Sequence, residues 1–285
     1  MPDHAPHPST ARITEHRPGP GRFVTTLVLE DLEGVRGVWH SRRNRKGLDA
    51  EPHHAIGRTP PRRYLPFEPE RITWWVGVSF MLGAALFATG SAAMWRHLAF
   101  EAISPWILFV GSIFFTTAAY LQVYEVVNEP DPESRIRPRA VWMRLEPAKI
   151  GWWASIVQFA GTLLFNVNTF AATRVLSRAE QEAWSWTPNA IGSMFFLIAS
   201  YLAYAEVCRG WAGVQPKNIS WWIVVINMLG SIAFGVSAVA SFVLPDGAAW
   251  SASLANLFTC LGAVCFFAAA YLLLPEMTAH ASPEP

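Results

Sequence analysis

Residues 68–75 read EPERITWW, a phrase in which two tryptophans follow a proline and three charged residues. The phrase returns as EPAKIGWW at 146–153 and as QPKNISWW at 215–222. Proline is favoured at the first position of a helix, because the amide hydrogen it lacks has no intrahelical partner there. Tryptophan is favoured at the boundary between hydrocarbon and water. The phrase therefore predicts the start of a membrane helix, with proline at its first position, three times in one chain.

Each tryptophan pair is interpreted as an anchor at the membrane interface, where an indole ring meets both hydrocarbon and hydrogen-bond partners. A role in substrate stacking or gating is the alternative. The six anchor residues are Trp74, Trp75, Trp152, Trp153, Trp221 and Trp222.

The distribution of charge indicates a membrane protein. Only 15% of the 285 residues are charged, against about 25% in an average soluble domain. Six stretches carry no charge and are each long enough to cross a bilayer as a helix. They are residues 72–95, 104–124, 150–173, 186–205, 218–244 and 249–274. The predicted fold class is an all-α integral membrane protein with six transmembrane helices.

Basic residues predict the orientation. With the amino terminus placed inside, 19 of the 22 Lys and Arg residues lie in inner segments, and only Arg96, Arg174 and Arg178 lie outside. Basic segments stay on the cytoplasmic side of a membrane. We therefore expect a multi-pass protein of the cell membrane with both termini in the cytoplasm.

Residues 1–66 are expected to form a polar cytoplasmic segment that is partly disordered. Proline, histidine and arginine are frequent in residues 1–22 and 47–66, which is typical of disorder. Between them, an apolar stripe with helical spacing runs from Val24 to Trp39, which would suit a helix lying on anionic lipid. Gly34 and Gly37 interrupt this stripe and favour instead a mobile or small folded segment.

The membrane part reads as three copies of a two-helix unit. Counted from the first tryptophan of each pair, glycine follows after 9 residues and phenylalanine after 13 in all three units. The second helices align on GSIFF (111–115), GSMFF (192–196) and GAVCF (262–266). The predicted repeats span residues 67–129, 144–210 and 213–277, followed by a cytoplasmic tail at 278–285. Because each repeat has an even number of spans, all three repeats share one orientation, and we expect them to form a pseudo-threefold ring. The glycines are expected to allow close packing between helices.

A glutamate stands fourteen residues after the glycine of each second helix. It lies at the helix end where the dipole disfavours a negative charge, so a partner is expected. The bases at the starts of the first helices lie at the same depth, which predicts a ring of interfacial salt bridges. An acidic vestibule for cations and solvated helix ends are the alternatives. The members of this charge ring are Glu125, Glu206, Glu276, Arg71, Lys149 and Lys217.

Few polar side chains lie within the spans. Gln158 and Asn227 occupy equivalent positions, where the first unit has Phe80. Asn166 and Asn168 have no amide at the equivalent positions, which hold Ala88 and Gly235, and Gly90 and Ser237. With Asn227 they are the candidate binding residues for a small polar solute. Hydrogen bonding between helices is the alternative role. We find no embedded acid or base, no histidine pair for haem and no phosphate loop, and therefore expect no catalytic residue, metal site or cofactor.

The GS-x-FF motif, followed by Tyr-Leu at residues 120, 201 and 271, resembles the YrhK-like family of small bacterial membrane proteins. The resemblance implies an uncharacterised membrane protein and carries no catalytic residues.

Two functions fit these patterns. One is a non-catalytic structural or stress-related role, through packing with membrane lipid and other membrane proteins and with no part for nucleic acid. The alternative is a passive channel or carrier for a small neutral solute along the pseudo-threefold axis. A centre packed with glycine, phenylalanine and leucine would favour the first. A continuous water path past the three asparagines would favour the second.

Overall fold

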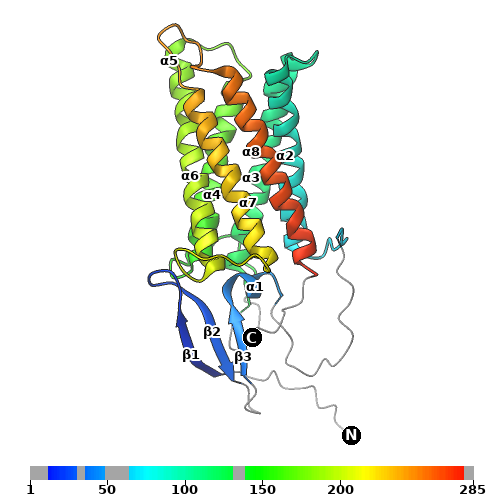
Figure 1. Ribbon diagram of the computed structural model, residues 1–285, viewed down its shortest axis with the longest axis vertical. Helices are drawn as coiled ribbons and strands as arrows, with labels where there is room; N and C mark the ends of the chain where they lie inside the picture. The colour runs from blue at the N-terminus through cyan, green and yellow to red at the C-terminus, as the bar shows by residue number, and fades with distance from the viewer. Residues whose placement is uncertain (1–11, 31–35, 49–63, 131–138, 279–285) are drawn as a thin grey trace.

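A computed structural model describes residues 12–30, 36–48, 64–130 and 139–278 of the chain. Figure 1 shows a tall bundle of helices with a small sheet at one end, which we call the sheet end; the opposite end is the loop end. Six helices are long and apolar enough to cross a membrane. The prediction of a helical membrane protein with six spans is confirmed.

The six long helices are α2 (Ile72–Arg96), α3 (Ser104–Val127), α4 (Ile150–Ala171), α6 (Thr187–Cys208), α7 (Ile219–Ala240) and α8 (Ala252–Glu276). Three short elements lie at the loop end: η1 (Glu101–Ile103), α5 (Arg178–Glu180) and the π-helical turn η2 (Gln181–Trp186). Ser177 and Glu180 begin α5 with reciprocal side-chain to backbone hydrogen bonds, a capping box.

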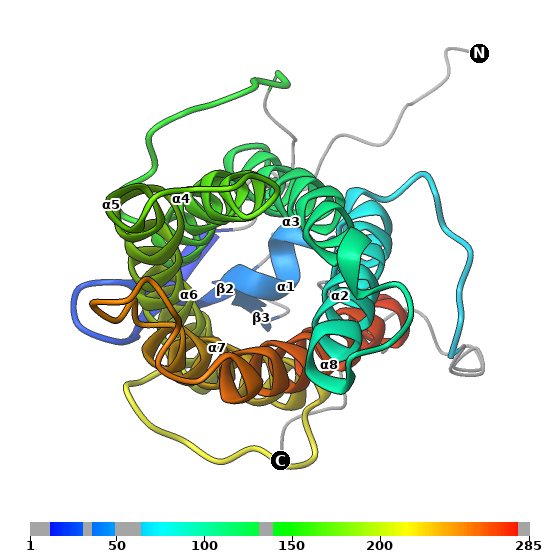
Figure 2. The same cartoon turned by 90° about the horizontal axis from the view of Figure 1, so that it is seen from above.

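The six long helices form a closed ring. Each packs against the next in chain order, and α8 packs against α2 to complete the circle. Figure 2 shows this ring from above, with the short helix α1 (Ser41–Arg45) beneath its centre. The chain therefore encloses an axis, and the side chains that point toward that axis determine whether it is open.

The helices begin differently from the sequence prediction. Proline was expected at the first helical position, but α2, α4 and α7 begin at Ile72, Ile150 and Ile219, three residues after the proline. The fourth residue of a β-turn donates its amide hydrogen to the carbonyl oxygen of the first, here the residue before proline, as Arg71 N–H does to Glu68 O at 3.0 Å. Proline thus occupies the second position of a β-turn, where its fixed φ is equally favourable.

The tryptophan pairs fasten these turns to the helices. The second indole of each pair donates to the carbonyl of the phrase's own proline, at 2.9 Å in the first unit (Trp75 to Pro69). The first indole reaches eight residues back, as Trp74 does to Pro66 O at 3.1 Å. The same two hydrogen bonds occur at the starts of α4 and α7. The indole rings therefore link the incoming loop to the helix.

Glycines bring neighbouring helices into backbone contact. A methyl group added to Gly83 on α2 would lie 2.9 Å from the Gly111 carbonyl oxygen on α3. A methyl group added to Gly230 on α7 would lie 2.7 Å from the Phe266 ring on α8. Gly161 on α4 has the same relation to the ring of Phe196 on α6, at 3.0 Å. Such close approach between helices in lipid requires a residue without a side chain.

Six phenylalanines from these six helices fill the axis of the ring. All are buried: Phe87, Phe115, Phe165, Phe196, Phe234 and Phe266. Their rings touch across the centre as well as within a helix pair, for example Phe87 and Phe234 with centroids 5.9 Å apart, and Phe115 and Phe266 also at 5.9 Å. We call this the phenylalanine layer. Tilted and edge-on contacts of this kind are favourable beyond simple burial.

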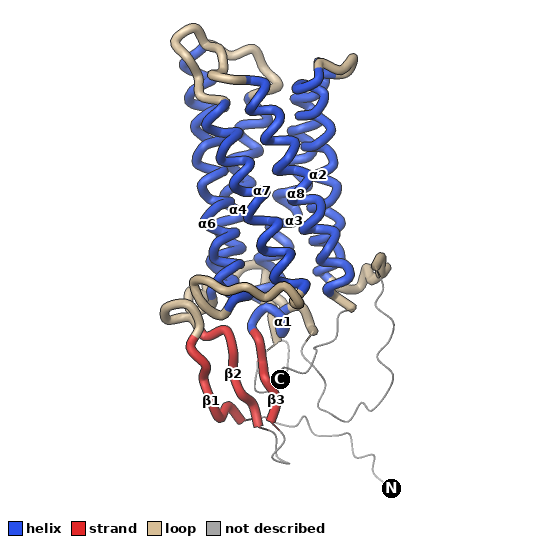
Figure 3. Tube along the Cα trace, in the orientation of Figure 1, coloured by secondary structure: helices blue, strands red, loops and turns tan. Residues whose placement is uncertain are grey.

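The amino-terminal segment is folded as a sheet. Strands β1 (Arg12–Pro18), β2 (Val24–Glu30) and β3 (Arg36–His40) form an antiparallel sheet in the order β1-β2-β3, drawn in red in Figure 3. Leu27, Leu29 and Trp39 pack together on it. The helical interpretation of the stripe from Val24 to Trp39 is therefore wrong, because residues 26–30 of β2 pair one for one with residues 36–40 of β3 in an antiparallel ladder.

The prediction of disorder is also wrong for residues 12–22, which form β1 and the turn after it. Residues 47–48 and 64–66 are also described, and the backbone groups of Leu48 and Pro66 form hydrogen bonds with Arg43 and Trp74. Residues 1–11 and 49–63 lie outside the described residues.

Gly230 and Gly235 on α7 offer a test of the packing argument. We predict that Gly230→Ala lowers the free energy of unfolding by about 1–3 kcal/mol, because the new methyl overlaps Phe266. Gly235→Ala is the matched control, since its methyl would lie at an ordinary 3.5 Å from Leu197. Thermal unfolding in detergent measures both, and equal stability of the two variants would contradict the close packing of α7 and α8.

Candidate functional site

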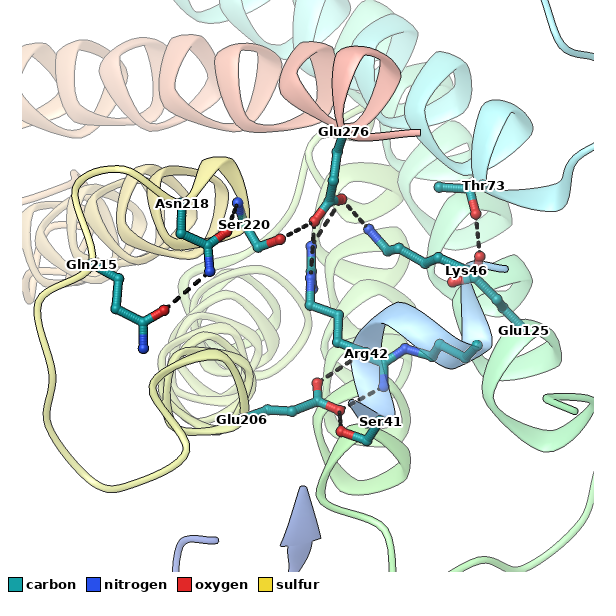
Figure 4. Close-up of polar contacts among 11 residues, drawn as sticks. Ser41, Arg42, Lys46, Thr73, Glu125, Glu206, Gln215, Asn218, Ser220 and Glu276 are labelled. Carbon is teal, nitrogen blue, oxygen red and sulfur yellow. Dashed lines mark hydrogen bonds and ion pairs between the residues drawn. The ribbon is translucent and has the colours of Figure 1, made fainter. Parts of the chain in front are cut away.

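The short helix α1 closes the sheet end of the ring with basic side chains. Arg42, Arg45 and the following Lys46 have only 13%, 9% and 5% of their side chains exposed. Figure 4 shows Arg42 and Lys46 extending from α1 toward carboxylates at the ends of the membrane helices. Charged groups are buried in proteins only when they are paired, so the partners define the site.

Glu206, at the end of α6, is the partner of Arg45. Arg45 donates through both terminal nitrogens to the two carboxylate oxygens, at 2.6 and 2.7 Å. The Ser41 hydroxyl donates to the same carboxylate at 2.8 Å. A two-point guanidinium–carboxylate contact is among the strongest polar interactions in proteins.

Glu276, the last residue of α8, has three partners. Lys46 donates at 2.5 Å, Arg42 at 3.3 and 3.4 Å, and the Ser220 hydroxyl of α7 at 2.5 Å. This carboxylate is 3% exposed and is therefore surrounded by donors from both α1 and the ring.

The third glutamate, Glu125 of α3, accepts a hydrogen bond from the Thr73 hydroxyl at the start of α2. Thr73 and Ser220 occupy the same place in their phrases, directly before the tryptophan pair. The second phrase has Gly151 at this place. A methyl group added to Gly151 would overlap the Arg45 guanidinium, so the missing side chain leaves room for the base that α1 supplies.

The bases expected to pair with these glutamates have other partners. Arg71 pairs with Glu68 at 3.0 Å, and Lys149 with Glu129 at 2.6 Å and Glu146 at 3.5 Å. Lys217 is exposed and has no ion pair with another described residue. The predicted pairing is thus wrong. The bases of the phrases stay in their own loops, whereas the bases that reach the glutamates come from a segment more than 150 residues away in the chain.

Burial and pairing alter the bases of α1. Burial lowers the pKa of Lys46 to about 8; the Arg42 charge acts in the same direction and Glu276 opposes it. Burial also acts against the charged form of Arg45, but Glu206 outweighs it and raises the pKa of that guanidinium. Arg45 is therefore held more firmly in its charged form than Lys46.

A cavity of about 70 Å³ lies inside the ring between α1 and the phenylalanine layer. Arg42 lines it at the sheet end, and Phe115, Phe196 and Phe266 line it toward the middle of the bundle. Its polar lining residues are Gln122, Gln158, Asn227, Ser200 and Ser231. Phe80, the counterpart of Gln158 and Asn227, lines it as well.

The three candidate binding asparagines are not brought together. Asn227 lines the cavity and donates to Ser200 Oγ at 2.8 Å. Asn166 donates to Thr116 Oγ1 at 2.9 Å, and Asn168 accepts from Ser185 Oγ at 3.0 Å. Neither Asn166 nor Asn168 lines the cavity. Both take part in contacts between neighbouring helices or turns, which was the alternative role.

Sequence reasoning missed the bases of α1 as site residues. Arg42, Arg43, Arg45 and Lys46 form an obvious cluster, but a cluster alone does not indicate whether it faces lipid, water or protein. Nothing in the sequence indicated that Glu206 would take its base from elsewhere, because its own predicted repeat contains Lys149.

Comparison with protein-family models, with curated proteins and with solved structures found no match to this chain.

The Arg45–Glu206 pair yields a direct prediction. Glu206→Gln leaves the buried Arg45 without its counter-charge, so we expect stability to fall by about 3–5 kcal/mol. The control Glu182→Gln lies on the exposed turn at the loop end and should have little effect.

A double-mutant cycle with Arg45→Met separates pairing from general damage. Because removing both charges leaves neither one buried alone, the double variant Arg45→Met/Glu206→Gln should recover much of the loss. Thermal unfolding and protease resistance of the amino-terminal sheet are the measurements. Strictly additive losses would show that the two residues do not act as a pair.

Proposed function

We propose that this protein is a non-catalytic membrane protein with a structural or stress-related role, acting through contacts of its helical ring with lipid and with other membrane proteins. The observation that carries the proposal is the phenylalanine layer, which fills the axis of the ring. Centroid separations of 4.9 to 6.4 Å among its rings leave no continuous path along the axis.

The outer surface of the ring also supports the proposal. Large apolar side chains such as Leu82, Ile113, Leu229 and Val264 are about half exposed on helices that could span a membrane. In a bilayer such residues face lipid tails or the helices of a partner. A protein whose apolar side chains point outward, while its axis is filled, acts through its surface.

We further propose a bacterial origin, kinship with the YrhK-like family and descent of the ring from three copies of one two-helix unit. Matching motifs in the sequence support the triplication, and so do the equivalent glycine contacts at Gly83, Gly161 and Gly230. The proposed location is the cell membrane, with the sheet end in the cytoplasm.

The proposed orientation follows from the basic residues, of which 19 of 22 belong to the segments that precede α2, join α3 to α4 and join α6 to α7. Reporter fusions after residues 180 and 280 check it. We expect an extracytoplasmic signal at 180 and a cytoplasmic signal at 280. An extracytoplasmic signal at 280 would overturn the orientation.

A flux measurement tests the function. Liposomes containing the purified protein should swell in glycerol or urea no faster than protein-free liposomes, because the phenylalanine layer blocks the axis. Phe196→Ala serves as a comparison, since it removes one ring of that layer. Rapid, protein-dependent swelling with the unaltered chain would refute the closed ring and favour a passive path for neutral solutes.

A passive channel or carrier for a small neutral solute is the second candidate, and the cavity beside the phenylalanine layer is the observation that favours it. In that case the layer and α1 would act as two gates on either side of the cavity. The flux measurement distinguishes this candidate from the first.

A further inference from the structure

The cavity inside the ring contains side-chain amides that the protein itself leaves without partners. Among the described residues, Gln122 of α3 and Gln158 of α4 have no side-chain hydrogen bond, although both line the cavity. Each amide offers one acceptor oxygen and two donor hydrogens. Polar groups within a membrane protein are costly unless they are satisfied, so these two amides require a partner inside the cavity.

The opposite wall of the cavity is polar in a different way. Asn227, Ser200 and Ser231 bond to one another: Asn227 donates to Ser200 at 2.8 Å, and the Ser200 and Ser231 hydroxyls are 2.7 Å apart. The Ser231 hydroxyl also donates to the backbone carbonyl oxygen of Asn227, at 3.1 Å. This network fixes the orientation of its members, so the wall presents preorganised donors and acceptors to whatever occupies the cavity.

The charges near the cavity favour an uncharged occupant. Among the described residues, Arg42 is the one charged residue of the lining, and it is bound to Glu276, which it shares with Lys46. An anion would have to compete with Glu276 for Arg42, and a cation would meet no carboxylate among the described lining residues. Charge that is not compensated inside a membrane protein is strongly unfavourable.

The volume limits the size of the occupant. A cavity of about 70 Å³ has room for about five water molecules, at roughly 10–15 Å³ for each. A solute of comparable size has about four to six non-hydrogen atoms by the same measure. The phenylalanine layer lies on one side of the cavity and Arg42 of α1 on the other.

We propose that this cavity is a binding site for a small uncharged solute that carries both hydrogen-bond donors and acceptors, of the amide class. Gln122 and Gln158 bind its polar groups, while Arg42 of α1 borders the site at the sheet end. The proposal concerns binding and is independent of whether the protein conducts solutes. A flux measurement that shows no swelling of the liposomes would therefore leave it unaffected.

Three probes of nearly the same shape test the class of ligand: acetamide, acetate and acetamidinium, with charges of zero, minus one and plus one. Thermal unfolding of the full chain in detergent is followed as each probe is titrated. We expect acetamide alone to raise the unfolding temperature in a saturable way. An equal saturable shift with acetate or acetamidinium would overturn the selection against charge.

Variants locate the effect in the cavity. Gln122→Leu and Gln158→Leu should each raise the half-saturating acetamide concentration at least tenfold. Gln181→Leu is the matched control, since that amide lies at the loop end and bonds to the Leu176 carbonyl. It should bind acetamide like the unaltered chain. Equal binding by all three variants would place the site elsewhere and overturn the proposal.

Ala203→Leu tests the cavity without removing a polar group, because Ala203 lines it and a larger apolar side chain fills the space. This variant should lose the saturable shift while keeping its thermal stability. If acetamide, urea and glycerol all give no saturable shift with the unaltered chain, the cavity holds water only and the proposal is wrong.

Discussion

The close approach of helix backbones at the glycine pairs is the constraint on which the ring depends. Lipid tails are as apolar as leucine, so helices in a membrane gain little from hiding apolar surface and associate through packing and hydrogen bonds. Gly111 lies against the ring of Phe87, and Gly262 against the ring of Phe234. Each glycine thus provides the space for a phenylalanine of the neighbouring helix, and these phenylalanines fill the axis of the ring.

The sheet end is held by charge instead of packing. Glu125, Glu206 and Glu276 lie near the sheet ends of α3, α6 and α8. Bases from α1 and Lys46 reach Glu206 and Glu276, whereas Glu125 bonds to a hydroxyl of α2. The attachment of α1 therefore makes the sheet end of the ring asymmetric, and Gly151, which has no side chain, leaves the space that the Arg45 guanidinium occupies.

Spacing within the chain predicted most of the membrane part, since the uncharged stretches, the phrase and the glycines are local features. The predicted starts of α2, α4 and α7 lie three residues too early, because proline suits the first helical position and a β-turn equally well. The strands at 24–30 and 36–40 and the docking of α1 could not be predicted. They depend on contacts between segments far apart in the chain, such as Arg45 with Glu206. The periodicity of residues within one helix carries no information on such contacts.

Arg42 connects the ion pairs of the sheet end with the cavity. It pairs with Glu276 and it also lines the cavity, so one of the contacts that hold α1 on the ring also borders the cavity. Movement of α1 away from the ring would expose two buried carboxylates and open the cavity in one step. The burial of the charges thus makes opening costly. A partner that provides bases for Glu206 and Glu276 would lower that cost, because it would replace the contacts that α1 gives up.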